Sequence, residues 1–480
     1  MQRTINGLSA LEARIATDFE YLNFPPNNWV SQRKDASGSP ILDVLIVGGG
    51  MCGLAANLAL RRMGIGNLRT IDASPAGQEG PWLNYARMET LRSPKHLTGP
   101  ALGLPNLTFR AWYEAQFGPT SWEQLGRIPR TQWAEYLEWY RGVTDIQIEN
   151  GKILTDLRPG DDCVQAQITD KQSGKAEVVP VRRIVLATGR DALATPRIPE
   201  QFASHVGNKV FHTSDAPTQE QFADKDVVVI GLAASAFDYA AEALEAGAAQ
   251  VTVLGRANRI PRVNKAKQIV YPGFSQGFSA LPDKERFETF RYISSHGVPP
   301  PRDTVLRVTR HKNFKLVLEA DVQDVVDDGD RLILKTKAGE FGAETVVLGT
   351  GFKIDISSAA FLTSLRNQIA VWHDQLTADG KAKELLNFPY LGTGFEFQAR
   401  EREAKEASAI QRIHCFNHAA MLSLGNLAND IPAVSEGAER LANTIAASFF
   451  VEEAKSHQAD LNAYVDPELL GDEIPQLEEW

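Results

Sequence analysis

The sequence predicts an α/β protein with two similar units, because one order of strands and helices occurs twice in it. Residues 41–47 (ILDVLIV) form a short apolar run, followed by a glycine-rich turn, a helical stretch and a second strand at 68–72. The same order returns over residues 225–256 (KDVVVIG, LAASAFDYAAEALEAG and AQVTVLGR). Uninterrupted apolar strands are typical of buried parallel sheets. We therefore expect two Rossmann-like units, each built on a strand–helix–strand core.

The composition is that of an ordinary globular protein with room for more than one domain. Of 480 residues, 43% are hydrophobic, and 60 acidic against 50 basic residues give a net charge of −10. An anionic chain is poorly matched to nucleic acid or to an anionic membrane, so neither is expected as a partner. The N-terminus lacks an apolar signal core, and no apolar run reaches the roughly 18–20 residues of a membrane helix. We expect a cytoplasmic protein, and the sequence is also compatible with a homo-oligomer.

The cysteines exclude two kinds of site. Cys52, Cys163 and Cys415 lie far apart in the sequence, and the chain has no CxxC pair. It therefore has neither the redox couple of a disulfide reductase nor the ligands of a structural zinc site, and no metal is expected. Their small, odd number fits a reducing compartment.

A dinucleotide-binding motif follows the first strand. Gly48-x-Gly50-x-x-Gly53 ends this strand and opens the helix. Gly48 allows the tight turn, Gly50 lets the backbone approach a pyrophosphate, and Gly53 allows close packing of helix and strand. Asp72 ends the second strand, where a carboxylate can bind ribose hydroxyls.

The second unit carries an altered form of this motif, Gly231-x-Ala233-x-x-Ala236 with Ser235 inside it. Alanine in place of the second glycine leaves less room for a pyrophosphate. The second strand is followed by Arg256 instead of an acid, and a cation there suits the 2′-phosphate of NADP. The alternative is a degenerate domain that is retained for its fold, with a solvated basic loop.

With these motifs in this order, the chain resembles the class B flavoprotein monooxygenases, which include flavin-containing, N-hydroxylating and Baeyer–Villiger enzymes. The resemblance covers roughly residues 41–450. It also rests on two turns after apolar strands, one with Gly189 (ATG) and one with Gly351 (LGTGF). It implies that FAD binds the first unit and NADPH the second, and that Trp82 of a Gly-Pro-Trp segment lies beside the flavin.

The resemblance also implies how the domains are arranged. An N-terminal extension at 1–40 precedes an FAD-binding domain formed by 41–198 and 331–480. The NADPH-binding domain is inserted between these two segments, at 199–330.

Arg92, Lys95 and His212 are the catalytic candidates that the resemblance suggests. The family's fingerprint between the domains is F-x-G-x-x-x-H followed later by an aromatic residue. Its histidine is kept here as His212, either as a hinge or gating residue or as a structural histidine. Arg92 and Lys95 belong to RSPKH, in which the arginine stands where flavin-containing monooxygenases have asparagine. A cation there would stabilise a peroxide anion or bind an anionic substrate group. The alternative for Arg92 is a surface ion pair.

A polar stretch near the C-terminus supplies further candidates. Asn426 and Asp430 precede a helix expected to start near Ala433, and in similar flavoproteins such a turn caps the flavin, with the helix dipole favouring the reduced anion. His414 and His418 are expected either to face the substrate or to be structural.

Taken together, the resemblance implies an FAD- and NADPH-dependent monooxygenase that forms a C4a-(hydro)peroxyflavin with O2 and oxygenates a small polar substrate. N-oxygenation of an amine or amino-acid-like compound is the preferred reaction, because the candidates near the flavin are polar. Baeyer–Villiger or S-oxygenation is the alternative, and a non-catalytic flavin-binding redox sensor is another. The identity of the substrate depends on variable loops and is not predicted.

Overall fold

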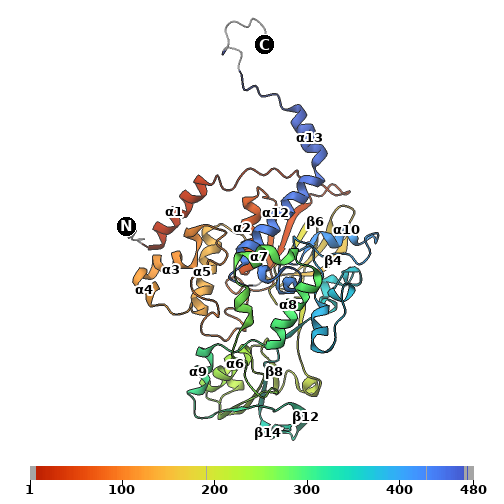
Figure 1. The fold of residues 1–480 in the computed structure, drawn as a ribbon. Coiled ribbons are helices and arrows are strands. Elements are labelled where there is room, and N and C mark those ends of the chain that lie inside the picture. Colours follow the sequence, from red (N-terminus) through yellow and green to blue (C-terminus); the bar gives the residue numbers. More distant parts are fainter. Residues whose placement is uncertain (1–6, 191, 429, 470–472, 474–480) are drawn as a thin grey trace.

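The computed structural model describes residues 7–190, 192–428, 430–469 and 473, and its ribbon forms a larger and a smaller lobe (Figure 1). The larger lobe contains a mixed sheet in the order β3-β2-β1-β6-β5-β4, with β17 also paired to β6. Strands β1, β2, β3 and β17 run parallel to their neighbours, including β6, whereas β5 is antiparallel to both β4 and β6. The strands are β1 (Leu42–Val47), β2 (Leu68–Asp72), β3 (Glu149–Asn150), β4 (Lys152–Pro159), β5 (Val164–Asp170), β6 (Ala176–Leu186) and β17 (Ile413–His414).

The smaller lobe is built on a second sheet, in which all pairs are parallel and the order is β11-β10-β9-β15-β8. Its strands are β8 (Val210–His212), β9 (Asp226–Ile230), β10 (Gln250–Leu254), β11 (Phe314–Val317) and β15 (Thr345–Leu348). Helix α6 (Ala234–Glu245) packs between this sheet and α9 (Arg302–Thr309). Both predicted strand–helix–strand units are therefore present, and the predicted α/β fold class is confirmed.

The predicted limits of the inserted unit differ from the structure at two places. The strands β12 (Val322–Asp327), β13 (Leu332–Thr336) and β14 (Gly339–Ala343) and the parallel strand β15 all share the core of the smaller lobe. This unit therefore continues past 330 to about residue 348, because β15 completes its sheet. In contrast, the segment from α7 (Pro272–Gly277) to α8 (Asp283–His296) places Phe278 and Phe287 in the core of the larger lobe.

The two connections between the lobes pair with each other. Strand β7 (Ala194–Pro196) leads into the smaller lobe, β16 (Phe352–Ile354) leads back, and they form a two-stranded antiparallel sheet. The Arg197 N–H donates to the carbonyl of Gly351 at 2.9 Å, next to this pair. The crossing is thus a paired ribbon and not two independent linkers.

The predicted N-terminal extension is part of the larger lobe. Helix α1 (Gly7–Tyr21) packs against α3 (Phe109–Phe117), and its Leu11 and Ile15 are buried. After residue 395, the described chain forms short helices and β17 before the long helix α12 (Val434–Glu452). The other helices are α2 (Met51–Arg62), α4 (Pro119–Gln124), α5 (Arg130–Val143), α10 (Ala407–Gln411), α11 (Met421–Leu424), α12 (Val434–Glu452) and α13 (Ala454–Ala463).

A buried group of charges attaches α12 to the first sheet. The Glu452 carboxylate, at the end of α12, lies 3.0 Å from Arg182, 2.6 Å from Arg183 and 3.0 Å from Arg412. Arg182 is fully buried and also contacts Asp43 of β1. Burial alone would raise the pKa of Glu452, but the surrounding guanidinium groups lower it to about 2. Because α12 also packs along α2, these ion pairs help to hold the helix beside the first glycine motif.

We predict that Glu452→Gln lowers the free energy of unfolding by about 2 kcal/mol at neutral pH, which is the contribution of the depressed pKa reduced for the solvent exposure of the carboxylate. Since the folded-state pKa lies below the ordinary value, this stabilisation is complete above the ordinary pKa and is lost as pH falls towards the folded one. Urea unfolding of both proteins at several pH values measures the difference, which should shrink in acid.

Glu439→Gln is the matched control, since Glu439 lies on the same helix, is 48% exposed and is 3.5 Å from Arg62. A surface pair of this kind should contribute less than about 1 kcal/mol. Equal losses for the two variants, or a loss at Glu452 that does not depend on pH, would contradict the assignment.

Candidate functional site

The first glycine motif forms a close contact between a helix and a turn. Gly48 has φ +108°, and a Cβ there would lie 2.4 Å from the carbonyl oxygen of Ala187. A Cβ on Gly53 would lie 1.8 Å from the Gly48 carbonyl oxygen. Gly50 precedes α2, and no side chain caps this helix end. Its first N–H groups are therefore available to an anion, as a dinucleotide pyrophosphate requires.

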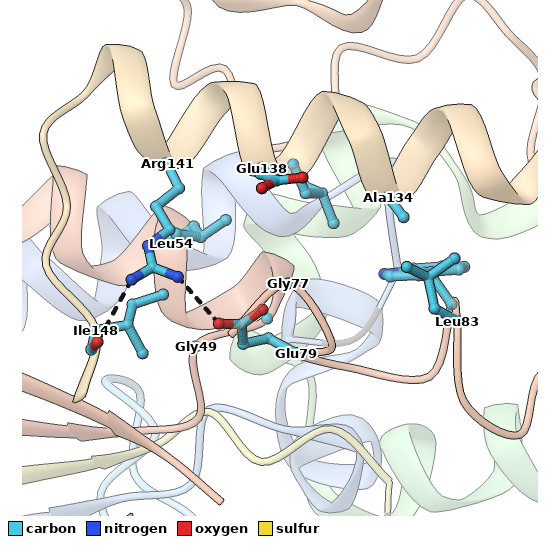
Figure 2. Close-up of a pocket in the computed structure, with 12 residues that line it drawn as sticks. Gly49, Leu54, Gly77, Glu79, Leu83, Ala134, Glu138, Arg141 and Ile148 are labelled. Atoms are coloured by element: carbon cyan, nitrogen blue, oxygen red, sulfur yellow. Dashed lines mark hydrogen bonds and ion pairs between the residues drawn. The ribbon is translucent and has the colours of Figure 1, made fainter. Parts of the chain in front are cut away.

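A pocket opens beside this loop, between it and helix α5 (Figure 2). Gly50 and Trp82, both predicted to contact the cofactor, line it together. Trp82 also packs edge-on against Trp133 of α5, with ring centroids 6.2 Å apart. The other lining residues are Gly49, Leu54, Gly77, Glu79, Leu83, Ala134, Leu137, Glu138, Arg141 and Ile148.

Both carboxylate oxygens of Asp72 are hydrogen-bonded to the protein backbone. One carboxylate oxygen accepts a hydrogen bond from the Gly49 N–H at 2.7 Å, and the other accepts from the Ser74 N–H, also at 2.7 Å. The side chain is 8% exposed. Asp72 therefore fixes the glycine loop to the end of β2. The pocket is lined instead by the carboxylates of Glu79 and Glu138, and Glu79, which was not predicted from the sequence, directly precedes the Gly-Pro-Trp segment.

The turn with Gly189 is held by the polar segment near the C-terminus. Asn417 donates to the Leu186 carbonyl at 3.0 Å and to the Thr188 hydroxyl at 3.2 Å, and the His418 N–H donates to the Gly189 carbonyl. Burial lowers the pKa of His418 to about 3 and that of His414 to about 4. Both histidines are therefore neutral near pH 7 and supply no cation for a substrate.

Asn426 and Asp430 line a second pocket, which lies before the N-terminus of α12. Tyr271 and Ser275, at and within α7, also line this pocket. Among the described residues of its lining, the charged side chains are Asp430 and Glu436. Burial raises the pKa of Asp430, and Arg190 opposes this rise. The remaining lining residues are Leu97, Ile269, Val270, Pro272, Phe274, Pro432 and Ala433.

The second glycine motif resembles the first in its packing. Gly231 has φ +130°, and a Cβ there would lie 2.5 Å from the Gly349 carbonyl oxygen. Ala236 is fully buried, and its Cβ would be 2.6 Å from a Cβ on Gly349. The alanine therefore fits because the turn beside it has no side chain. Ala233 and Ser235 lie exposed at the start of α6.

Arg256 is exposed just after β10. Gly255 before it packs closely on Leu232, which precedes α6. Within the described chain, Arg256, Arg259 and Arg262 form no ion pair. This basic segment beside a helix N-terminus is thus suited to an additional phosphate.

His212 contacts the connection between the lobes. It ends β8, is 1% exposed, and its Nε2 lies 3.0 Å from the carbonyl oxygen of Gly351. Its Nδ1 is 2.8 Å from the Ser214 hydroxyl, and its ring packs edge-on against Phe352. Burial lowers its pKa. The structure therefore brings together His212 and Gly351, and both lie at the crossing ribbon.

Arg92 and Lys95 are both bonded within the protein, and for Arg92 the bond is an ion pair, as in the alternative to its catalytic role. Arg92 forms an ion pair with Asp238 of α6 at 3.0 Å, so it links the two lobes. Lys95 donates to the carbonyls of Trp122 and Leu125, both at 2.5 Å, at the end of α4. Such a cation at a helix C-terminus is stabilising. Lys95 is therefore a helix cap, and Arg92 is a contact between the lobes.

The cysteines are buried and unpaired, and burial raises the pKa of the Cys52 thiol to about 12. Among the described residues, no helix is long and apolar enough to cross a membrane. The same part of the chain has no cluster of three His, Cys, Asp or Glu side chains arranged for a metal ion.

Three comparisons with known proteins agree with this geometry. The family model for pyridine nucleotide-disulphide oxidoreductases matches residues 45–298. The FAD-dependent urate hydroxylase of Xanthomonas campestris pv. campestris is 34% identical over 461 residues, which cover 95% of this chain and 96% of that protein.

Solved structures share the fold at lower identity. The ornithine hydroxylase of Pseudomonas aeruginosa superposes with a TM-score of 0.67 at 17% identity, over 85% of this chain and 99% of that one. The L-lysine 6-monooxygenase of Pseudomonas syringae has a TM-score of 0.63 at 18% identity, over 85% and 98% of the chains. This chain belongs to the pyridine nucleotide-disulphide oxidoreductase family and, within it, to the flavoprotein monooxygenases with two dinucleotide-binding domains.

Proposed function

We propose that this protein is a monooxygenase that uses FAD and NADPH to transfer one oxygen atom of O2 to a small nitrogen-containing substrate. Bound FAD would accept a hydride from NADPH and, once reduced, react with O2. FAD fits the larger lobe, because no side chain caps the N-terminus of α2, and Gly49 and Gly50 at this helix end line a pocket together with Trp82. The family of the chain and its relatives support the choice of both cofactors.

The residues of the larger lobe would bind FAD along the first glycine motif. The free N–H groups at the start of α2 would receive the pyrophosphate, and Trp82 would cover one wall of the pocket. Asn426 and Asp430, ahead of α12, would lie towards the flavin ring, where the helix dipole stabilises negative charge.

The residues of the smaller lobe would bind NADPH. The N-terminus of α6 would receive its pyrophosphate, with Gly231 shaping the turn and the exposed Ala233 leaving the helix end accessible. Arg256 would bind the 2′-phosphate by charge-assisted hydrogen bonds.

We propose that the FAD-binding domain comprises 41–198 and the chain from about 350 onwards, and that 199–349 forms the NADPH-binding domain, apart from the segment with α7 and α8, which packs on the larger lobe. The core shared by β12–β15 and the second sheet supports the later boundary. His212 would act as a positioning residue at the crossing ribbon, since its ring contacts Gly351 and Phe352. The three unpaired cysteines support a cytoplasmic location.

The charge of the second pocket favours N-oxygenation of an amine or amino-acid-like substrate. Of the described residues that line it, Asp430 and Glu436 are the charged ones, and carboxylates attract an ammonium group. None of the basic residues predicted to lie near the substrate is free to bind an anion. His414 and His418 are neutral, and Arg92 and Lys95 already have partners within the protein.

Hydroxylation of urate is the second candidate. It is favoured by the relative that matches 95% of this chain at 34% identity and is named for that reaction. Phe274 and Tyr271 in the second pocket offer aromatic contacts to a planar purine.

The substrate is tested by supplying the FAD-loaded protein with NADPH, O2 and either urate or an amine such as ornithine, lysine or cadaverine. We expect one amine to accelerate NADPH oxidation and to gain one oxygen atom, measured by mass spectrometry. The same result with urate alone would select the second candidate. NADPH oxidation that yields only hydrogen peroxide with every compound would contradict the proposed function.

A variant of the second pocket tests whether Asp430 binds the amine. For an amine, Asp430→Asn should raise KM about tenfold with a smaller change in kcat, since one charged hydrogen bond is lost. Because burial raises the pKa of Asp430, amine binding should also weaken as pH falls towards that pKa, and the variant should lose this dependence. Glu439→Gln, on α12 outside the pocket lining, is the control.

We predict that Arg256→Ala raises KM for NADPH at least about tenfold and leaves KM for NADH nearly unchanged, because only NADPH carries the 2′-phosphate. Steady-state kinetics with both coenzymes measure the ratio. Lys284→Ala, an exposed change on α8, is the control. If Arg256→Ala weakens both coenzymes equally, the arginine does not recognise the phosphate.

A further inference from the structure

The pocket beside the first glycine motif contains two carboxylates, Glu79 and Glu138, which differ in their exposure to solvent (Figure 2). Glu138 is exposed on α5. The Glu79 side chain is 10% exposed and is held in the pocket by Arg141, at 3.1 Å. A charge this deeply buried is retained only where it has partners, so its hydrogen bonds indicate what it does.

The two oxygens of Glu79 are used unequally. Oε1 accepts hydrogen bonds from Arg141 at 3.1 Å and from the Asn150 side-chain amide at 2.7 Å. Oε2 accepts no hydrogen bond from any residue that the structure describes. In Figure 2 this second oxygen points away from Arg141. Arg141 and Asn150 therefore fix the orientation of the carboxylate and leave one oxygen for a donor from outside the protein.

The position of Glu79 selects the part of the ligand that it can meet. Its Cγ would be 3.3 Å from a Cβ on Gly49, so the side chain lies directly beside the glycine loop. A carboxylate repels a phosphate but accepts hydrogen bonds from hydroxyl groups. The neighbouring sugar of a nucleotide whose pyrophosphate lies at the start of α2 supplies such hydroxyls.

Asp72, the residue that the sequence predicts for this task, is already engaged. Each of its oxygens accepts a backbone N–H at 2.7 Å, one from Gly49 and one from Ser74. These bonds hold the loop in place and direct the carboxylate towards the backbone. The two functions expected of one acid are therefore divided between Asp72 and Glu79.

We propose that Glu79, held by Arg141 and Asn150, accepts hydrogen bonds from the ribose hydroxyls in the adenosine half of FAD, while Asp72 shapes the glycine loop. This inference rests on the proposed binding of FAD to the larger lobe. Glu79 is thus a positioning residue for the cofactor, and its contribution is measurable without turnover.

The test compares FAD with an analogue that has 2′-deoxyribose in its adenosine half. The apoprotein is titrated with each, and Kd is read from the flavin fluorescence. We expect the wild type to bind FAD at least about tenfold more tightly than the analogue, the size of a hydrogen bond to a charged group. Glu79→Gln should bind FAD at least about tenfold more weakly and no longer distinguish the two ligands.

Two further variants separate the roles. Asp72→Asn should keep the wild-type ratio of the two Kd values, even where both rise. Glu135→Gln, an exposed change on α5 outside the pocket lining, should keep both the ratio and the affinity. The thermal unfolding midpoint of each apoprotein reports whether a variant has lost its fold, and only ratios from folded variants are compared.

The outcomes distinguish this inference from the proposed function. If the wild type binds no FAD, the proposed function fails. If it binds FAD, the inference is overturned when Glu79→Gln keeps the wild-type preference for FAD, or when Asp72→Asn abolishes this preference.

Discussion

The close approach of a helix to a glycine turn is the contact on which the rest of the structure depends. In the larger lobe, α2 comes so near the turn after β1 that a Cβ on Gly53 would lie 1.8 Å from the Gly48 carbonyl oxygen. In the smaller lobe, Gly231 and Ala236 pack against the turn at Gly349 in a similar way. Each contact sets the start of one helix at the end of its sheet, so that uncapped N–H groups face outwards.

A few contacts hold the two lobes in position relative to each other. The crossing ribbon of β7 and β16 joins them covalently, and His212 contacts it at Gly351. The Arg92–Asp238 ion pair joins the larger lobe to α6 at a second place. The second pocket belongs to the larger lobe, because Ile269 and Phe274, which come from the insertion and line it, pack against the core of that lobe. A shift of the smaller lobe would therefore change the distance between the two cofactor sites more than the shape of this pocket.

The sequence was sufficient for the features that depend on local pattern. Apolar strands, glycine spacing and the helix after Ala433 are all properties of neighbouring residues, and the fold class follows from them. The features it did not predict depend on contacts between distant residues. Lys95 caps a helix that ends near residue 124, and Ala236 fits only because a glycine lies opposite it at position 349. Glu79 could be recognised only after its hydrogen bonds with Arg141 and Asn150 were known.

The central claim is that NADPH bound to the smaller lobe reduces FAD bound to the larger one. It is tested most directly by mixing the FAD-loaded protein with stoichiometric NADPH in the absence of oxygen and following the visible absorption of the flavin. If the two sites hold NADPH and FAD close enough for hydride transfer, this absorption is bleached, and it returns when air is admitted. A flavin that remains oxidised in the presence of NADPH would contradict the claim.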